Sequence, residues 1–115
     1  MKFGPYVRIL REKREISLRK FAEKLEKSPT LVSHIEIGHD IPLSEETITK
    51  WAQLLDEDPD LFLAMNGKIS EELTSIIIKN PLVFSSLIRN LKSLSKKRQE
   101  EVVEEVVRKV KDGEW

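Results

Sequence analysis

Two short helices that follow each other almost without a gap are the feature that most constrains this chain. The second begins at Ser28 and Pro29 in the stretch SPTLVSHIEIG, because serine accepts hydrogen bonds from free amides and proline suits the first helical position. Gly38 marks its end. The first begins at Ser17 and has apolar residues at helical spacing: Leu18, Phe21, Ala22 and Leu25. A connection of only about three residues predicts a helix pair held at an angle by a tight turn.

The rest of the chain has helical spacing as well. A helix is expected over residues 6–13, another after Ser44, and a short one from Pro59 to about Gly67. Further helices are expected after three caps in the tail, at Ser70, Asn80-Pro81 and Ser95. The alternation typical of strands is missing. We therefore expect an all-α fold, with a five-helix domain in residues 1–67 and a two- to three-helix extension in residues 68–115.

Charge is distributed unevenly along a chain whose formal net charge is zero. Residues 1–39 hold nine Lys and Arg against five Asp and Glu, residues 40–67 one against seven, and residues 68–115 ten against eight. An anionic partner would therefore meet the first third of the chain, although solvated helix faces also explain a surplus of this size. Cysteine is absent and no long apolar run occurs, which predicts a cytoplasmic protein without disulfides or a membrane span.

A known family is similar to this chain over residues 10–38, which read LREKREISLRKFAEKLEKSPTLVSHIEIG. The chain here resembles the DNA-binding core of the Xre, Cro and lambda-repressor-like helix-turn-helix regulators. The likeness continues through residues 42–62, PLSEETITKWAQLLDEDPDLF, and covers residues 3–67 in all. No single dipeptide is diagnostic, and the joint register of the residues carries the resemblance.

The resemblance implies a role for each polar residue of the helix pair. Such regulators place the second helix in the major groove, which implies that residues 29–37 contact base edges. The base-contacting residues would be Thr30, Ser33 and His34, and the phosphate-contacting residues Ser17, Arg19, Lys20 and Ser28. An ordinary polar helix surface and solvated cations are the alternatives. Leu18 stands where many members have a groove-facing polar residue, and packing into the helix pair is its alternative role.

The resemblance also implies a structural ion pair, and the sequence departs from the family pattern at two positions. Arg11 and Glu36 would form a pair that fixes the register of the helices. Glu26 stands where the family usually has glycine at positive φ, which costs about 1 kcal/mol. Asp40 lies in the loop where members often offer a cation to phosphate. Both departures predict weak DNA binding by a monomer, or binding that depends on dimerisation.

An enzyme or a metal site finds little support in the residues. The stretch HIEIGHD contains His34 and His39, but histidines five apart with Gly38 between them should diverge. Neither a third histidine nor a cysteine is present, and the serines at 17, 28, 44, 70 and 95 are expected to cap helices. We therefore expect no catalytic residue, no metal and no cofactor.

The tail carries apolar faces that are too strong to remain in contact with water. Packing on the first domain is one possibility, expected for Leu73 and Ile77. Burial against a second copy is the preferred one, because regulators of this family bind two half-sites as two-fold dimers. The dimer or partner contact is predicted to involve eight residues: Val83, Phe84, Leu87, Ile88, Leu91, Val103, Val106 and Val107.

Two hypotheses for function follow. The first is a sequence-specific, dimeric regulator of transcription that binds double-stranded DNA, most simply a repressor of its own promoter. The second is a protein-interaction module, similar to antitoxins or to regulators controlled by a metallopeptidase, whose tail holds a toxin or that peptidase.

Overall fold

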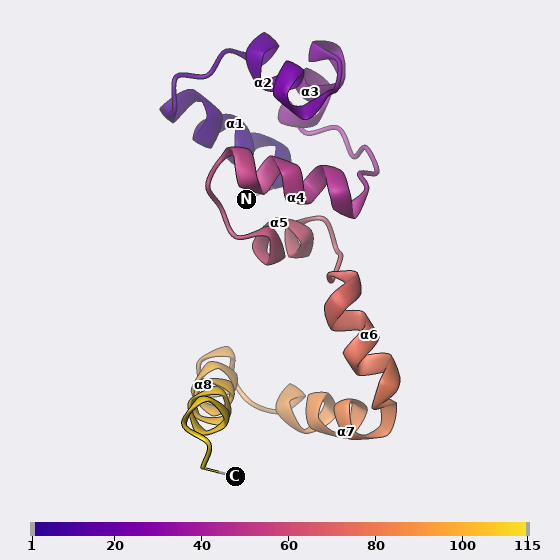
Figure 1. Ribbon diagram of the computed structural model, residues 1–115, viewed down its shortest axis with the longest axis vertical. Helices are drawn as coiled ribbons and strands as arrows, with labels where there is room; N and C mark the ends of the chain where they lie inside the picture. The colour runs from indigo at the N-terminus through magenta and orange to yellow at the C-terminus, as the bar shows by residue number, and fades with distance from the viewer. Residues whose placement is uncertain (1, 115) are drawn as a thin grey trace. The chain divides into compact units, whose positions relative to one another are not determined.

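A computed structural model describes residues 2–114 and contains eight α-helices and no strand in that range (Figure 1). The helices are α1 (Phe3–Lys13), α2 (Leu18–Leu25), α3 (Pro29–Glu36), α4 (Glu45–Leu54), α5 (Pro59–Met65), α6 (Glu71–Lys79), α7 (Pro81–Lys92) and α8 (Lys96–Asp112). The all-α prediction is therefore confirmed. The chain divides between Leu73 and Thr74 into two compact units, and each unit is described by itself.

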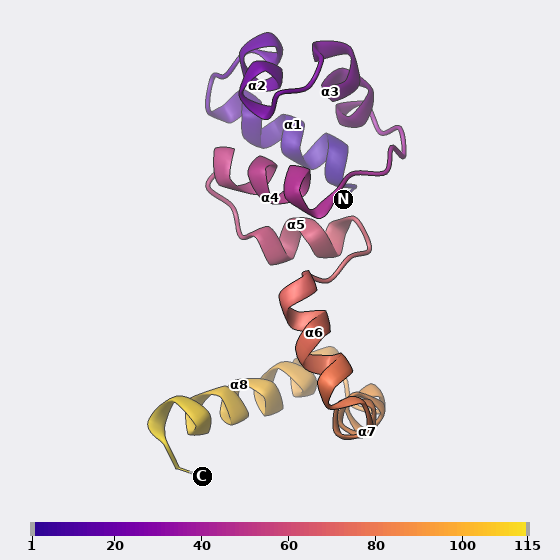
Figure 2. The same cartoon turned by 45° about the vertical axis from the view of Figure 1, so that its right-hand side comes forward.

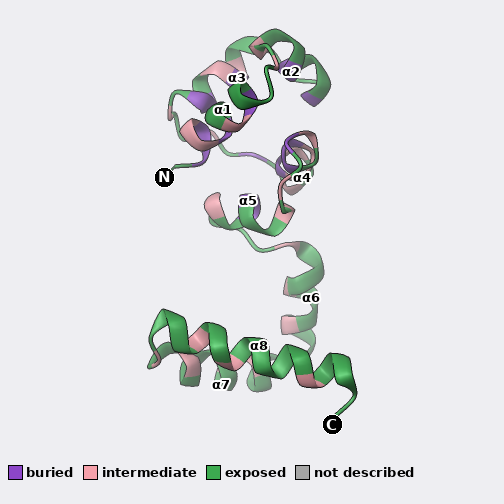
Figure 3. Ribbon diagram, turned by 90° about the vertical axis from the view of Figure 1, so that its left-hand side faces the viewer, coloured by how far each residue is buried: buried purple, intermediate pink, exposed green. Residues whose placement is uncertain are grey.

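The first unit contains α1 to α5 and the hydrophobic core. Figure 2 shows α2 and α3 together at one end of this unit and α5 at the other. All buried residues of the described chain lie between Phe3 and Leu63, as the purple segments of Figure 3 show. An aromatic cluster occupies the centre, where the rings of Phe3 and Trp51 and those of Phe3 and Phe62 each have centroids 5.2 Å apart. Edge-to-face rings at this separation stabilise a core beyond the area that they bury.

The first helix begins earlier than predicted. It was expected at residue 6, and α1 begins at Phe3. Pro5 is compatible with this earlier start, because a proline in the first turn lacks only an amide that would have no helical partner there anyway. The extra turn brings Phe3 into the aromatic cluster.

Serine caps begin most of the helices where the sequence predicted them. The side chains of Ser17, Ser28, Ser44 and Ser95 accept from backbone amides three residues ahead, at 3.1–3.2 Å. Asn80 differs, because its side-chain amide donates to the carbonyl of Ile76 at 3.2 Å and does not cap α7. The Asn80 side chain therefore satisfies a backbone carbonyl at the end of α6.

The second unit contains the end of α6 with α7 and α8, and none of its described residues is buried. The side chain of Gln99 in α8 donates to the carbonyl of Leu91 at 2.8 Å, so it satisfies the end of α7. Leu73, at the end of the first unit, is 41% exposed and does not pack against the hydrophobic core, contrary to the expectation. Ile77 belongs to the second unit and is half-buried there. No described helix is both long and apolar enough to cross a membrane.

Candidate DNA-binding surface

The start of α3 is built from the Ser28-Pro29 pair. The hydroxyl oxygen of Ser28 accepts from the amide of Leu31 at 3.1 Å, and Pro29 occupies the first turn. Both residues are exposed. The remaining amides of this turn have no helical partner, so the helix start can bind an anion such as a phosphate.

The two faces of α3 differ in chemistry. Val32 and Ile35 are buried in the core, and Leu31 packs partly against it. Thr30 and His34 are exposed, and Ser33 is half-buried. The outward face therefore carries the three residues predicted to contact bases, and none of them is used by the core.

The end of α3 is a turn with a left-handed residue. Gly38 has φ +106°, its amide donates to the carbonyl of Ile35 at 3.0 Å, and the amide of His39 donates to that of His34 at 3.0 Å. This is the Schellman arrangement of a helix end. The turn folds the chain back, so that the rings of His34 and His39 lie with centroids 5.3 Å apart.

The expectation that these two histidines diverge is therefore wrong. It rested on their spacing of five residues with Gly38 between them, whereas the turn at Gly38 brings the two rings together. His39 thus joins the outward face of α3, and sequence reasoning missed it although Gly38 had been identified as the stop. No group of three or more metal-binding side chains occurs within residues 2–114.

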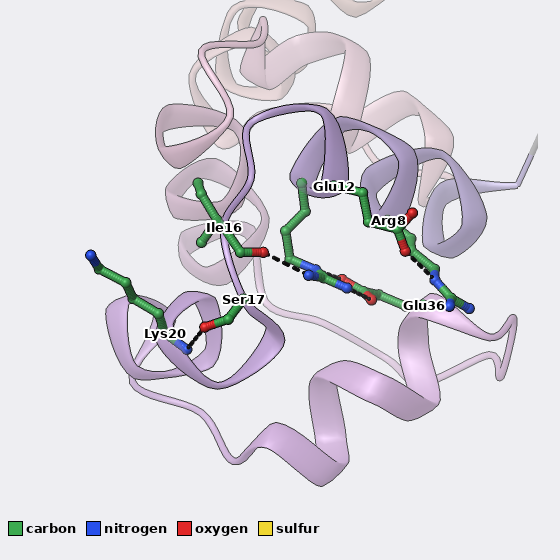
Figure 4. A network of polar contacts seen from close by, with 7 residues as sticks. Arg8, Glu12, Ile16, Ser17, Lys20 and Glu36 are labelled. Atoms are coloured by element: carbon green, nitrogen blue, oxygen red, sulfur yellow. Dashed lines mark hydrogen bonds and ion pairs between the residues drawn. The ribbon is translucent and has the colours of Figure 1, made fainter.

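Arg11 and Glu36 join α1 to α3 through a buried ion pair. The Nε of Arg11 donates to Oε2 of Glu36 at 2.7 Å and its Nη2 to Oε1 at 2.9 Å, while Nη1 donates to the carbonyl of Ile16 at 2.7 Å (Figure 4). The hydrogen bond to Glu36 raises the pKa of the Arg11 guanidinium, against the opposing effect of burial. This bidentate geometry fixes the orientation of α3 relative to α1.

A glycine that the sequence analysis did not single out allows α1 to approach α3. A Cβ on Gly4 would overlap with the carbonyl oxygen of Ile35. Gly4 is buried, so the neighbouring backbone has no room to move away. The signal in the sequence was slight, since a glycine before a proline usually indicates a loop.

The start of α2 offers a second anion-binding helix end next to two cations. The hydroxyl oxygen of Ser17 accepts from the amide of Lys20 at 3.1 Å (Figure 4). Arg19 and Lys20 are exposed in the first turn. Leu18 is half-buried and packs against the core. Of its two expected roles, packing into the helix pair is therefore the one that the structure shows.

The turn between α2 and α3 contains the unusual Glu26. This residue has φ +60°, which confirms that a left-handed conformation is required at this position. Its carboxylate lies 3.6 Å from the ammonium of Lys50 in α4. Asp40, the other acidic departure, is exposed in the loop after α3.

Comparison with known proteins agrees with this geometry. Residues 7–62 match the family model described as Helix-turn-helix. The chain carries a helix-turn-helix domain of the Xre and lambda-repressor-like family. The comparisons with curated proteins and with solved structures find no match. The helix-turn-helix pair is α2 and α3, and the family consists in general of DNA-binding regulators of transcription.

The residues predicted for the dimer or partner contact lie in α7 and α8, outside the helix-turn-helix domain. Phe84 and Leu91 are half-buried in the second unit. The other six are exposed, from 41% for Val106 to 70% for Val83: Val83, Leu87, Ile88, Val103, Val106 and Val107. The second unit therefore presents apolar side chains that its own helices do not cover.

Proposed function

We propose that this chain is a sequence-specific regulator of transcription that inserts α3 into the major groove of DNA. The observation that carries the proposal is the outward face of α3. Thr30, Ser33 and His34 stand free of the core on a helix that a buried ion pair holds in place. Short polar side chains approach base edges closely, and a rigidly held helix keeps them in register.

The phosphate contacts belong to the two helix starts. Ser28 stands at the start of α3, and Ser17, Arg19 and Lys20 stand at the start of α2. Contacts of this kind set the position of a protein on the duplex and its general affinity. Phosphate contacts release counterions from DNA when the protein binds. Binding therefore weakens as the salt concentration rises.

The regulator acts as a dimer and, in the simplest case, represses its own promoter from the cytoplasm. The exposed apolar residues of α7 and α8 support the dimer, because patches of this kind are rarely left in contact with water. Two copies provide two α3 helices for two half-sites. The gain in affinity from binding two half-sites together offsets the affinity lost because the loop at Asp40 has no cation for phosphate.

The test of this function is a titration of the upstream intergenic DNA. We expect binding that is tighter than to a scrambled duplex of equal length and that weakens linearly on a logarithmic salt scale. Equal affinity for both duplexes at every salt concentration would contradict sequence-specific binding.

A second candidate is a protein-interaction module that holds a toxin or a metallopeptidase. The exposed acids Glu26 and Asp40 near the helix-turn-helix pair favour it, as does the exposed tail. Loss of DNA binding in the titration, together with a monomeric full-length chain, is the result expected from this candidate.

A further inference from the structure

The helix α8 carries an apolar stripe that the rest of its own unit leaves largely exposed. Val103, Val106, Val107 and Val110 are 41–66% exposed. They recur every three or four residues, so they lie on one side of the helix. Valine is a modest helix former, and an isolated helix of this length is marginal in water. The helix therefore needs a contact along this stripe.

The contact with α7 covers only the beginning of α8. An open groove of about 610 Å³ lies between the two helices, lined by Ile88 and Leu91 from α7 and by Gln99 and Val103 from α8. The residues of α8 beyond Glu104 do not line this groove. The second half of the stripe thus remains available to another chain.

Charges along α8 change sign at the centre of the stripe. Within residues 100–111 four acids precede it and three bases follow it: Glu100, Glu101, Glu104 and Glu105, then Arg108, Lys109 and Lys111. Outside this segment α8 begins with Lys96, Lys97 and Arg98 and ends with Asp112. Val106 and Val107 lie between the two blocks. Within the helix, Glu105 lies 3.7 Å from Arg108 and 3.8 Å from Lys109. These side chains are exposed, and pairs of this kind contribute little in water.

We propose that α8 pairs with α8 of a second copy in antiparallel orientation, with the two-fold axis at Val106 and Val107. Val103 of each copy then faces Val110 of the other. The acidic segment 100–105 of each helix lies along the basic segment 108–111 of the other, so that Glu104, which flanks the stripe, approaches Lys111 of the other copy. A parallel pair would instead place acids beside acids and bases beside bases. The proposal rests on the dimeric part of the proposed function and specifies its contact.

Cysteine cross-linking of the full-length chain tests the orientation, because the chain has no cysteine of its own. Two variants, Val103→Cys and Val110→Cys, are oxidised with diamide alone and after mixing. We expect a disulfide-linked dimer only in the mixture, in about half of the chains, since random pairing makes half of the dimers mixed. Arg108→Cys is the control, because Arg108 is 60% exposed and lies away from the stripe. It should not cross-link alone or in either mixture.

The outcomes separate this contact from the function on which it rests. Efficient cross-linking of Val103→Cys by itself would show a parallel pair and overturn the proposal. A full-length dimer in sedimentation without any of these cross-links would overturn the α8 contact and leave the dimer intact. A monomer in sedimentation would overturn both, while the DNA titration decides separately whether the domain binds DNA. Circular dichroism of each variant verifies that its helices are formed.

Discussion

The ion pair between Arg11 and Glu36 is the single contact on which the position of α3 most depends. The side chain of Arg11 is 10% exposed and that of Glu36 is 4% exposed. Removing one member of such a pair leaves a buried charge without its partner, which is more costly than losing the attraction alone. Arg11 also donates to the carbonyl of Ile16, so its guanidinium satisfies three acceptor oxygens at once.

Replacing Arg11 by alanine should lower the free energy of unfolding by about 3 kcal/mol, and Glu36→Ala by less, because Arg11 keeps its bond to Ile16. The double variant should lose clearly less than the sum of the two. Thermal or urea unfolding of the four proteins measures this coupling.

A matched control lies on the same helix. Arg8 and Glu12 form an exposed pair at 2.8 Å, almost the same distance as in the buried pair. Arg8→Ala should leave the free energy of unfolding nearly unchanged, because water screens exposed pairs. Additive losses at Arg11 and Glu36 would mean that burial gives their pair no special role.

At the scale of elements, one turn is used repeatedly to end helices. Gly38 ends α3, Gly67 ends α5 and Gly113 ends α8, each at positive φ. The turns after α1, α2 and α4 have acidic residues in the same conformation: Glu15, Glu26 and Asp56. An acid there is doubly unfavourable, because its side chain crowds the left-handed backbone and its charge opposes the helix dipole.

Glu26→Gly should therefore stabilise the domain by about 1 kcal/mol, since glycine adopts this conformation without strain. The gain is reduced by the loss of the ion pair with Lys50, which is exposed and weak. Glu15→Gly should give a similar gain at a turn without that pair. Glu23→Gly, inside α2, should destabilise the domain by a similar amount. A loss of stability in Glu26→Gly would contradict the strain argument.

The elements were largely predictable from the sequence because each has a local signal. Serine caps, glycine stops and helical spacing place α2 to α5 and α8 within a few residues. The signals failed where a distant contact decides the structure. Gly4 was not singled out, yet it is buried against Ile35, and the ring of His39 meets that of His34 through a chain reversal. The spacing of residues along the chain predicts neither the contact of Gly4 with Ile35 nor that of His34 with His39.

At the scale of the molecule, the helix-turn-helix motif and every residue that is buried within 2–114 belong to the first unit. A chain that ends at Leu73 keeps this core and also the hydrogen bond from the amide of Glu71 to the carboxylate of Glu45. The exposed apolar residues of α7 and α8 are lost. The truncation therefore separates binding to one half-site from assembly of the dimer.

We expect this shortened chain to unfold cooperatively as a monomer and to bind a two-half-site operator about 100-fold more weakly than the full chain. Light scattering gives the oligomeric state, and a titration gives the affinity. A shortened chain that remains dimeric would place the contact within the first 73 residues. Equal affinity of the two chains would mean that the tail does not link the half-sites.

The most direct test of the central claim measures which bases α3 reads. Sites selected from random DNA by the wild-type chain define the operator, and each base pair is then varied in titrations with wild type, His34→Ala and Lys20→Ala. His34→Ala should lose discrimination of about 1–3 kcal/mol at one base pair of each half-site. Lys20→Ala should bind all sequences more weakly and reduce the salt slope by about one. If His34→Ala keeps the wild-type affinity for every sequence, α3 does not read bases through this face.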